Sequence, residues 1–342
     1  MLTFKTSSFA NFNDRISEGI LNFSYSKEKA LNVIAPPFSS PSVFLKIIFK
    51  FIEAKKRVLY ITEEIEENIQ LLSIIKKQTD FRYYSYIRNN IFQNNALLTV
   101  CNYTNAASMN EKYDLVIYDD LNSFPKYNSF EIIDVITNCI KESGKVICFS
   151  IEGIFKAQRD ILIPNRSNKK PLSEPRYVIT RIDLNKEIPF MIYDYLSFSV
   201  ENDRKVVIYI SNNTEKVHNV FSYLCNFRSI LSKNIMYFIS GESEEKILYN
   251  FSRIKRAILV TDDFKDRSIC LDDADVIVYF SDDVFFDYKK LTFLCGKVGR
   301  SDKLRASEVI FLANDVTYDM DKAKNIIRYF NKESWEMGLL NI

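Results

Sequence analysis

Two neighbouring aspartates could carry out chemistry on a phosphate. Asp119 and Asp120 come directly after the strand-like run 114–118, and Asn122 and Ser123 follow closely. Carboxylates at the end of a buried strand can hold Mg²⁺ and orient the attacking water in phosphoryl transfer. Acidic residues also commonly begin the turn after a strand, so this segment alone leaves both interpretations open.

A second segment occupies the place where nucleoside triphosphatases bind phosphate. Residues 35–42, Ala-Pro-Pro-Phe-Ser-Ser-Pro-Ser, lie between a predicted strand and a predicted helix. A phosphate-binding loop needs glycines, whose N–H groups converge on the anion, and a lysine that reaches the outer phosphates. Phe38 and Pro41 stand in this loop instead; phenylalanine resists positive φ, and proline lacks an N–H. We favour a simple helix start, with Ser40 as N-cap and Pro41 at the first helical position.

Two cations form the third candidate. Lys297 and Arg300 follow a predicted helix within the segment Gly-Lys-Val-Gly-Arg at 296–300. Cations in a cleft can stabilise charge on a transferring phosphoryl group. A helix end with a glycine cap and basic residues that match the helix dipole has the same spacing. Spacing alone favours this second interpretation.

The elements that must position these residues follow from hydrophobic patterning. Short β-branched or aromatic runs alternate with longer amphipathic runs, which predicts an α/β protein with mainly parallel sheets in both halves. In the first half we expect strands over 31–35, 57–61, 96–101, 114–118 and 145–150, and helices over 41–54, 64–78 and 129–142. In the second half we expect strands over 205–210, 235–239, 257–261, 276–280 and 309–312, and helices over 214–227, 244–254, 288–295 and 319–331. Such sheets bind ligands at the carboxyl ends of their strands.

Length and composition indicate an ordinary globular protein. The chain has 342 residues, 47% of them hydrophobic and 26% charged, with a net charge of +2, which fits two domains and names no partner. The proline-containing segment 164–175 predicts a boundary that separates domains 1–165 and 166–342. The six cysteines stand singly, so neither a zinc module nor a disulfide framework is expected. Without a signal peptide or an apolar run of about 18 residues, we expect a cytoplasmic protein with no transmembrane segment.

Taken in order, these segments resemble the two RecA-like lobes of superfamily 2 helicases, and most closely the ComFA family of late-competence proteins. Residues 119–125 are similar to that family's Asp-Glu-Val-Asp-Ala-Phe-Pro box, with Asp120 for the glutamate and Asn122 for the second aspartate. Residues 258–268 resemble its Ile-Leu-Val-Thr-Thr-Thr-x-x-Glu-Arg-Gly motif. Residues 293–300 resemble Gln-x-x-Gly-Arg-x-Gly-Arg, and 170–175 resemble the Pro-Leu-Pro-x-Pro joint between the lobes.

The resemblance implies a nucleotide site and assigns roles in it to individual residues. It assigns catalytic roles to Asp119, Asp120 and Arg300, with Asp119 at Mg²⁺, and assigns nucleotide contacts to Ser39, Ser40, Ser42, Lys297 and Arg300. The chain also departs from the family pattern. Pro41 replaces the phosphate-binding lysine, Phe293 replaces a glutamine, Lys297 replaces an arginine, and the family's four-cysteine zinc module is absent. We therefore expect weak or absent ATP hydrolysis, and ATP with Mg²⁺ as cofactors only if the chain is active.

The resemblance also implies contacts to the backbone of single-stranded DNA. The matching positions are small or hydroxyl-bearing residues, namely Thr62, Thr99, Ser211, Gly241 and Thr261. Two carboxylates next to Thr62, those of Glu63 and Glu64, would repel a phosphate there. The segment 82–88 interleaves arginines with tyrosines and could stack bases, but a tyrosine-rich edge strand is the interpretation we favour. We expect the single histidine, His218, to lie on a surface helix.

Two hypotheses from different classes follow. The first is a degenerate ComFA-like helicase core that binds single-stranded DNA weakly or serves as a scaffold for competence or DNA-processing proteins. The alternative is an active ATP-dependent DNA translocase of the competence machinery, in which Asp119, Asp120 and Arg300 still act. A third possibility, a partner subunit that has lost both ligands, differs from the first only in its affinity for DNA.

Overall fold

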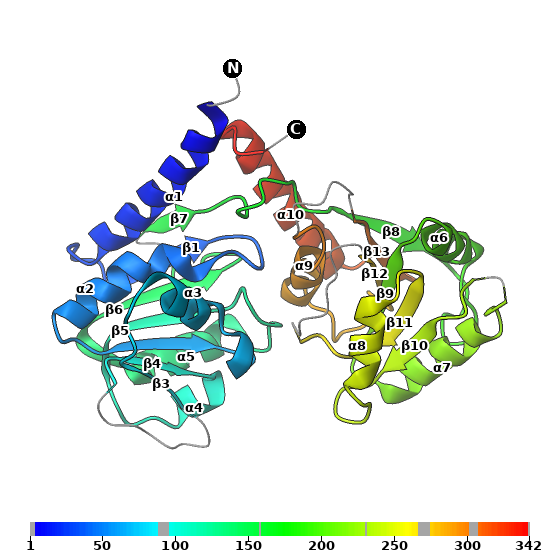
Figure 1. Cartoon of the computed structure of the whole chain (residues 1–342), viewed down its shortest axis with the longest axis horizontal. Helices are drawn as coiled ribbons and strands as arrows, with labels where there is room; N and C mark the ends of the chain where they lie inside the picture. Colours follow the sequence, from blue (N-terminus) through cyan, green and yellow to red (C-terminus); the bar gives the residue numbers. More distant parts are fainter. Residues whose placement is uncertain are drawn as a thin grey trace. The chain divides into compact units, whose positions relative to one another are not determined.

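The computed structural model describes residues 4–87, 96–156, 159–229, 231–265, 274–300 and 307–340. The chain divides into two compact units. Unit 1 contains residues 1–169 and 332–342, and unit 2 contains residues 170–331. Each unit is built on one sheet of parallel strands (Figure 1).

Unit 1 has a seven-stranded sheet in the order β3-β4-β2-β5-β6-β1-β7. Its strands are β1 (Ala30–Ile34), β2 (Val58–Thr62), β3 (Tyr84–Tyr86), β4 (Leu98–Cys101), β5 (Tyr113–Asp119), β6 (Ile140–Ser150) and β7 (Asp160–Leu162). Its helices are α1 (Phe4–Phe23), α2 (Leu45–Glu53), α3 (Gln70–Gln78), α4 (Tyr103–Ala107) and α5 (Ser129–Cys139), with 3₁₀ turns η1 (Pro41–Phe44) and η2 (Glu66–Asn68).

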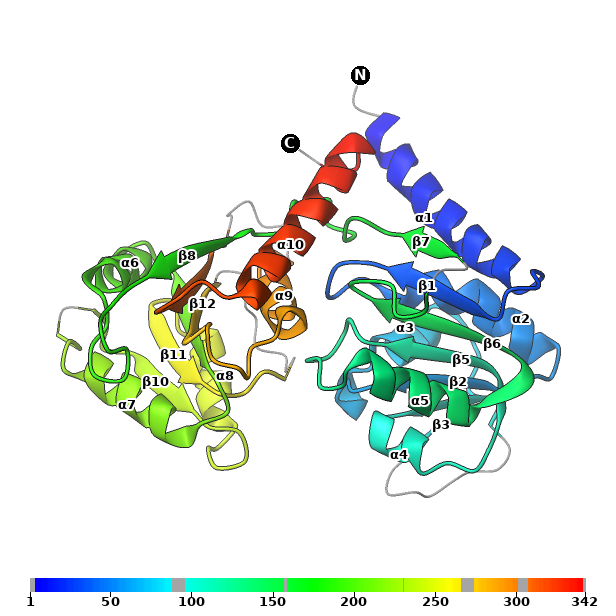
Figure 2. The same cartoon turned by 180° about the vertical axis from the view of Figure 1, so that it is seen from behind.

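Helices cover both faces of this sheet, so its central strands are apolar on both sides. Figures 1 and 2 show α2 and α3 on one face and α4 and α5 on the other. Every residue of β2, Val-Leu-Tyr-Ile-Thr, is buried, as expected of a central parallel strand. Leu59 and Ile61 of β2 pack with Ile132 and Ile136 of α5, and the Phe44 ring meets Phe149 edge-on with centroids 5.0 Å apart on the other face.

Unit 2 has a six-stranded sheet in the order β10-β11-β9-β12-β13-β8. Its strands are β8 (Pro175–Ile179), β9 (Lys205–Ile210), β10 (Ile235–Phe238), β11 (Ala257–Thr261), β12 (Ala274–Tyr279) and β13 (Val309–Ala313). Its helices are α6 (Phe190–Glu201), α7 (Thr214–Cys225), α8 (Lys246–Arg253), α9 (Tyr288–Gly296) and most of α10 (Tyr318–Glu336).

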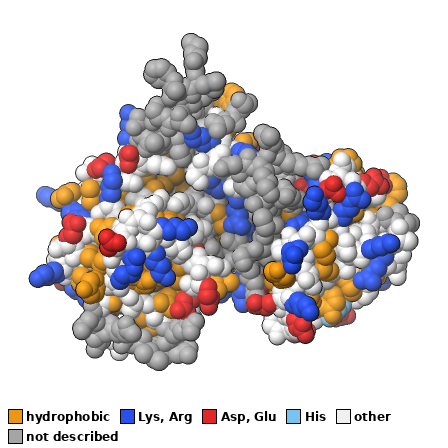
Figure 3. Space-filling view, in the orientation of Figure 1, with side chains coloured by type: hydrophobic (Ala, Val, Ile, Leu, Met, Phe, Trp, Pro, Cys, Tyr) orange, Lys and Arg blue, Asp and Glu red, His pale blue; other side chains and the backbone are white. Residues whose placement is uncertain are grey.

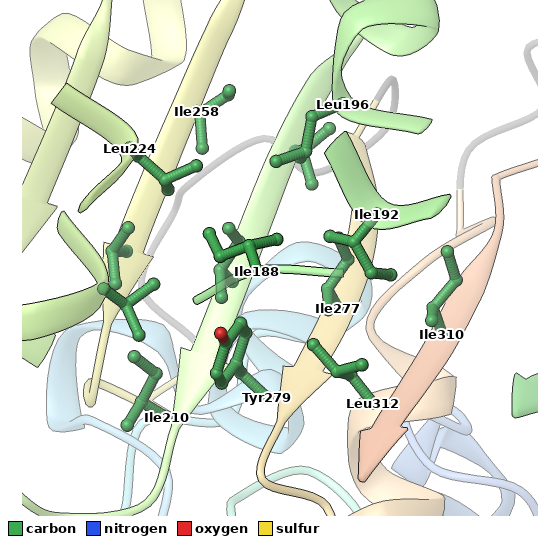
Figure 4. Close-up of a cluster of buried hydrophobic side chains, with 14 of the residues drawn as sticks. Ile188, Ile192, Leu196, Ile210, Leu224, Ile258, Ile277, Tyr279, Ile310 and Leu312 are labelled. Carbon is green, nitrogen blue, oxygen red and sulfur yellow. The ribbon is translucent and has the colours of Figure 1, made fainter. Parts of the chain in front are cut away.

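A hydrophobic core of unit 2 lies between its sheet and the helices α6 and α7. Figure 4 shows Ile192 and Leu196 of α6 and Leu224 of α7 above the strand residues Ile277 and Ile310. The Tyr279 hydroxyl within this core donates to the Leu184 carbonyl (3.0 Å). Burial of such branched side chains supplies most of the free energy that holds the layers together.

The structure confirms the predicted fold class, because both sheets are parallel and lie in α/β layers. The expected strands and helices are present with shifted ends. The helix predicted over 129–142 ends at Cys139, because Ile140 pairs with Tyr113 and begins β6. The interpretation of 82–88 as an edge strand is confirmed by β3, which pairs with β4 and comes first in the strand order of the described sheet. It buries Ser85 between two half-buried tyrosines; residue 88 lies outside the described residues.

Candidate nucleotide site and nucleic-acid contacts

Asp119, the last residue of β5, is the centre of a buried polar cluster in unit 1. Its side chain is 2% exposed. Oδ1 accepts the N–H groups of Leu121 (2.9 Å) and Asn122 (3.2 Å), and Oδ2 accepts Asn122 Nδ2 (2.8 Å) and the Tyr60 hydroxyl. Four protein donors therefore converge on the carboxylate to which the resemblance assigns Mg²⁺.

Burial raises the pKa of two hydrogen-bonded groups in this cluster, the Asp119 carboxyl and the Tyr60 hydroxyl. Burial raises the pKa of Asp119 above its usual value, although the hydrogen bonds from Tyr60 and Asn122 oppose that rise. Burial also raises the pKa of Tyr60 well above its usual value, so its phenol stays protonated and donates. Asp120 is 7% exposed, and its N–H donates to the Phe149 carbonyl of β6 (2.9 Å).

The loop 36–42 uses its own N–H groups. Pro36, Pro37 and Pro41 have none. The N–H groups of Phe38 and Ser39 donate to the carbonyls of Leu121 (3.1 Å) and Pro36 (3.3 Å). The N–H of Ser42 donates to Ser40 Oγ (3.3 Å), which confirms Ser40 as the N-cap of η1 with Pro41 at its start. Of this described segment, at most the Ser40 N–H is left for an anion.

The expectation that phenylalanine avoids positive φ in this loop is wrong. Phe38 has a φ of 64°, a left-handed conformation that costs a non-glycine residue about 1–2 kcal/mol. Its side chain is only 9% exposed, and its N–H bonds to the Leu121 carbonyl. Burial of the ring and this bond offset the strain, so the bend of the chain is kept without glycine.

The loop serines bond to the protein and connect to Asp119 through Asn122. Ser39 Oγ donates to the Pro36 carbonyl (2.7 Å), and Ser40 Oγ donates to Ser42 Oγ (3.0 Å). Asn122 Nδ2, which binds Asp119, also reaches the Ser39 carbonyl (3.2 Å). No described atom pairs with the buried Asn122 Oδ1. Sequence reasoning noticed Asn122 only as a replacement for an aspartate and missed this bridging role.

Lys297 and Arg300 lie in unit 2. Lys297, at the end of α9, is 3% exposed. Its Nζ donates to the Lys265 carbonyl (3.1 Å) and lies 5.2 Å from the centroid of the Tyr209 ring. The ammonium thus packs inside unit 2, while Arg300 is partly exposed. Residues 266–268, part of a segment that carried the resemblance, lie outside the described residues.

The nucleic-acid candidates of unit 1 are buried. Thr62 is 1% exposed at the end of β2, and its Oγ1 accepts the Glu64 N–H (3.2 Å). Thr99 is 3% exposed and lies inside β4, not after it. Next to Thr62, the Glu63 carboxylate accepts the Tyr103 N–H (2.9 Å) and Lys126 Nζ (2.7 Å). Glu63 therefore joins the segments that follow β2, β4 and β5.

In unit 2, hydroxyl groups at the strand ends also bond within the protein. Ser211 Oγ donates to Asp283 Oδ2 (3.1 Å), and Thr261 Oγ1 accepts the Asp263 N–H (2.9 Å). Gly241 is exposed with a φ of 85°, in a turn after β10. The preceding N–H, of Ser240, donates to Asp262 Oδ1 (2.8 Å). Burial raises the pKa of the Asp262 carboxyl above its usual value.

The chain is similar in sequence to two competence proteins. No family model matches the chain. It is 20% identical over 339 residues to the competence protein ComFA of Streptococcus pneumoniae, covering 94% of this chain and 77% of that protein. It is 20% identical over 232 residues to ComFA of Bacillus subtilis, covering 64% of this chain and 49% of that protein.

Solved structures of nucleic-acid-bound proteins are similar to this chain in fold over most of its length. Dbp5 of S. cerevisiae, bound to RNA and ADP BeF3, matches 90% of this chain and 87% of its own with a TM-score of 0.54 at 12% identity. RecG bound to a three-way DNA junction matches 96% of this chain and 46% of its own with a TM-score of 0.54 at 14% identity. The chain thus has a ComFA-like core, similar to ComFA in sequence and to these solved structures in fold. Units 1 and 2 match two tandem RecA-like lobes in their fold.

Among the described residues of the ComFA-like core, no group of three His, Cys, Asp or Glu side chains is placed to hold a metal ion. No described helix combines the length and the apolar character that crossing a bilayer requires. On the face in Figure 3, basic and acidic side chains of the described residues are interspersed over both lobes.

Proposed function

We propose that this chain serves DNA uptake or DNA processing in the cytoplasm as a weak single-stranded DNA-binding or scaffold component with weak or absent ATP hydrolysis. One observation carries the proposal: the loop 36–42 offers at most one N–H, that of Ser40, to a phosphate. Similarity in sequence to ComFA and in fold to structures bound to RNA and DNA supports a role near nucleic acid.

The missing donors matter because triphosphate chemistry depends on them. Charge develops on phosphate oxygens in the transition state, and removal of one fixed donor from such a site lowers kcat by about 10²–10³. Here several loop N–H groups are absent or bonded internally, and Pro41 stands where the resemblance places a lysine. The combined loss predicts turnover close to the uncatalysed background.

The state of Asp119 supports the same proposal. Both carboxylate oxygens already accept two donors each. Binding of Mg²⁺ through this group requires that some of those donors give way, and each buried donor left unpaired costs about 1–3 kcal/mol. Asp119 as found here is suited to holding Asn122, the Tyr60 hydroxyl and the loop in place.

Magnesium-dependent ATPase activity of the full chain, with and without single-stranded DNA, tests this proposal. We expect turnover at background level in both conditions. The control is Asp119→Asn, with circular dichroism to verify that the variant is folded. DNA-stimulated turnover that is lost in folded Asp119→Asn would overturn the proposal and support the active translocase instead.

DNA binding needs its own measurement. Fluorescence anisotropy of a labelled single-stranded oligonucleotide across a salt series should show weak binding whose affinity falls as salt rises, because phosphate contacts release counterions. Binding that is absent even at low salt would remove DNA from the proposed function and leave the scaffold role.

A further inference from the structure

In each lobe, one carboxylate at the carboxyl edge of the sheet holds a lysine and a second donor. In lobe 1 it is Glu63, which follows β2, and in lobe 2 it is Asp283, which follows β12. Each is partly exposed, with side-chain exposures of 14% and 20%. Both therefore lie near the surface, at the edge where open parallel sheets bind their ligands.

The Asp283 carboxylate accepts hydrogen bonds from two side chains that follow β9. Its Oδ2 accepts Lys216 Nζ (2.7 Å) and Ser211 Oγ (3.1 Å). Lys216 lies in the first turn of α7, and its ammonium is 4.5 Å from the centroid of the Phe280 ring. The aromatic ring and the carboxylate together hold this cation in one position. Ser211 is one of the residues that we expected to contact a DNA phosphate.

Glu63 does the same in lobe 1 with donors from other segments. Its two oxygens accept the Tyr103 N–H (2.9 Å) and Lys126 Nζ (2.7 Å). The Tyr103 ring stacks on the ring of Tyr127, the neighbour of Lys126, with centroids 3.7 Å apart, so the two segments that carry these donors are in contact. A hydroxyl or N–H and an ammonium that converge on one anion are the groups with which proteins bind phosphate oxygens.

We propose that the Glu63 and Asp283 carboxylates bind the donors that a nucleic-acid phosphate would otherwise contact. They thereby keep the affinity of this core for single-stranded DNA low. A DNA phosphate would have to displace a carboxylate that is covalently part of the site, and that carboxylate would then repel the strand. This inference rests on the proposed DNA function and identifies the side chains that limit it.

The test measures affinity of full-length Asp283→Asn and Glu63→Gln for a fluorescein-labelled oligo(dT) by anisotropy at several salt concentrations. Each substitution keeps the shape of the side chain and removes the charge that pairs with a lysine, Lys216 in Asp283→Asn and Lys126 in Glu63→Gln. We expect about three- to tenfold tighter binding for each variant than for the unmodified chain. The slope of log K against log salt should steepen by about 0.7 for each phosphate gained.

Two controls make the result specific. Glu174→Gln removes the same charge from Glu174, whose carboxylate pairs with Arg328 (2.9 Å) just before β8, at the amino edge of the sheet; it should leave affinity unchanged. Lys216→Ala, added to Asp283→Asn, should abolish the gain because the freed ammonium is its source.

Three results would overturn the inference. They are an equal gain in Glu174→Gln, a gain that persists in the Lys216→Ala double variant, and folded variants that bind DNA no more tightly than the unmodified chain does. Absence of binding by the unmodified chain and by every variant would instead count against the proposed DNA function as well, so the two failures are distinguishable.

Discussion

At the scale of single residues, Asp275 and Glu174 carry the same charge in very different surroundings. Asp275, in β12, is 1% exposed, and it accepts Arg204 Nη1 (3.1 Å) and the Glu308 N–H (2.9 Å). The Glu174 side chain is 43% exposed and pairs with Arg328. Loss of a buried partner leaves an uncompensated charge inside the protein, whereas loss of an exposed partner leaves a hydrated one.

Asp275→Ala should therefore lower the free energy of unfolding of unit 2 by about 3–5 kcal/mol, and Glu174→Ala by less than about 1 kcal/mol. Hydrogen exchange of the β9 and β12 amides, followed by mass spectrometry, reports on unit 2 alone. Similar exchange rates in the two variants would contradict the assigned role of Asp275.

The Asp283 carboxylate predicts a pH dependence with a definite sign. Burial by itself would raise the pKa of Asp283, but the Lys216 ammonium and the hydrogen bonds from the Phe285 N–H and Ser211 Oγ bring it below the usual value. A lowered pKa in the folded state contributes stability above the unfolded pKa of about 3.9, and that contribution is lost as pH falls through the folded pKa.

The difference in stability between the unmodified chain and Asp283→Asn should thus be largest above about pH 5 and shrink below about pH 4. Because the pair is partly exposed, we expect a difference of about 1 kcal/mol or less. Hydrogen exchange of unit 2 measured between pH 3 and pH 6, corrected for intrinsic exchange rates, checks this. A difference that grows toward acid pH would have the wrong sign.

At the scale of elements, α2 ends in a left-handed residue that is not glycine. Lys55 has a φ of 55°, and it follows the helix end at Glu53 by two residues. The N–H groups of Lys55 and Lys56 donate to the carbonyls of Ile52 and Phe51 (both 2.9 Å). This pattern of helix termination favours glycine at the position of Lys55.

Lys55→Gly should raise the free energy of unfolding of unit 1 by about 0.5–1 kcal/mol, because glycine lacks the Cβ that is strained at positive φ. Lys55→Ala keeps that Cβ and should give no such gain. Phe38 has a similar φ but a buried ring, so Phe38→Gly should destabilise unit 1. Protection of the α2 amides against exchange measures all three variants, and a gain in Lys55→Ala equal to that in Lys55→Gly would refute the explanation.

At the scale of the whole molecule, a tandem-lobe scaffold is kept while the donors at its strand ends bond within the protein. Asp119 binds four donors, the 36–42 loop caps its own helix, and Lys297 packs inside unit 2. A ligand that binds only the folded state stabilises it by RT ln(1 + L/Kd), where L is the free ligand concentration. Thermal stability therefore reports nucleotide binding independently of turnover.

One millimolar ATP with Mg²⁺ should shift the melting temperature by less than about 1 °C. A site with a Kd near 10 μM would add about 2.7 kcal/mol at that concentration, enough to move the melting temperature of a lobe by about 5–10 °C. Differential scanning fluorimetry, with ATP in EDTA as the control, measures this. A Mg²⁺-dependent shift of several degrees would contradict the argument that the loop 36–42 lacks the donors to hold a triphosphate.

The sequence alone determined the features that depend on local chemistry and on the order of motifs. Alternating apolar runs predicted parallel sheets, and Ser40 with Pro41 predicted a helix start that the Ser42 N–H confirms. Such features involve residues a few positions apart, so composition and spacing are enough to predict them. The resemblance to ComFA and the helicases likewise followed from the order of segments.

Tertiary structure decided which donors meet which acceptors. Asn122 reaches Ser39, Glu63 reaches Lys126, and Asp283 reaches Lys216 across 83, 63 and 67 positions of sequence. The order of strands in each sheet brings these pairs together, because the carboxyl ends of neighbouring parallel strands lie at one edge whatever their separation in the chain. Sequence patterns therefore indicated the strand ends as a candidate site, and only the fold decided that the donors of Tyr103, Lys126 and Lys216 there would bond to carboxylates of the chain itself.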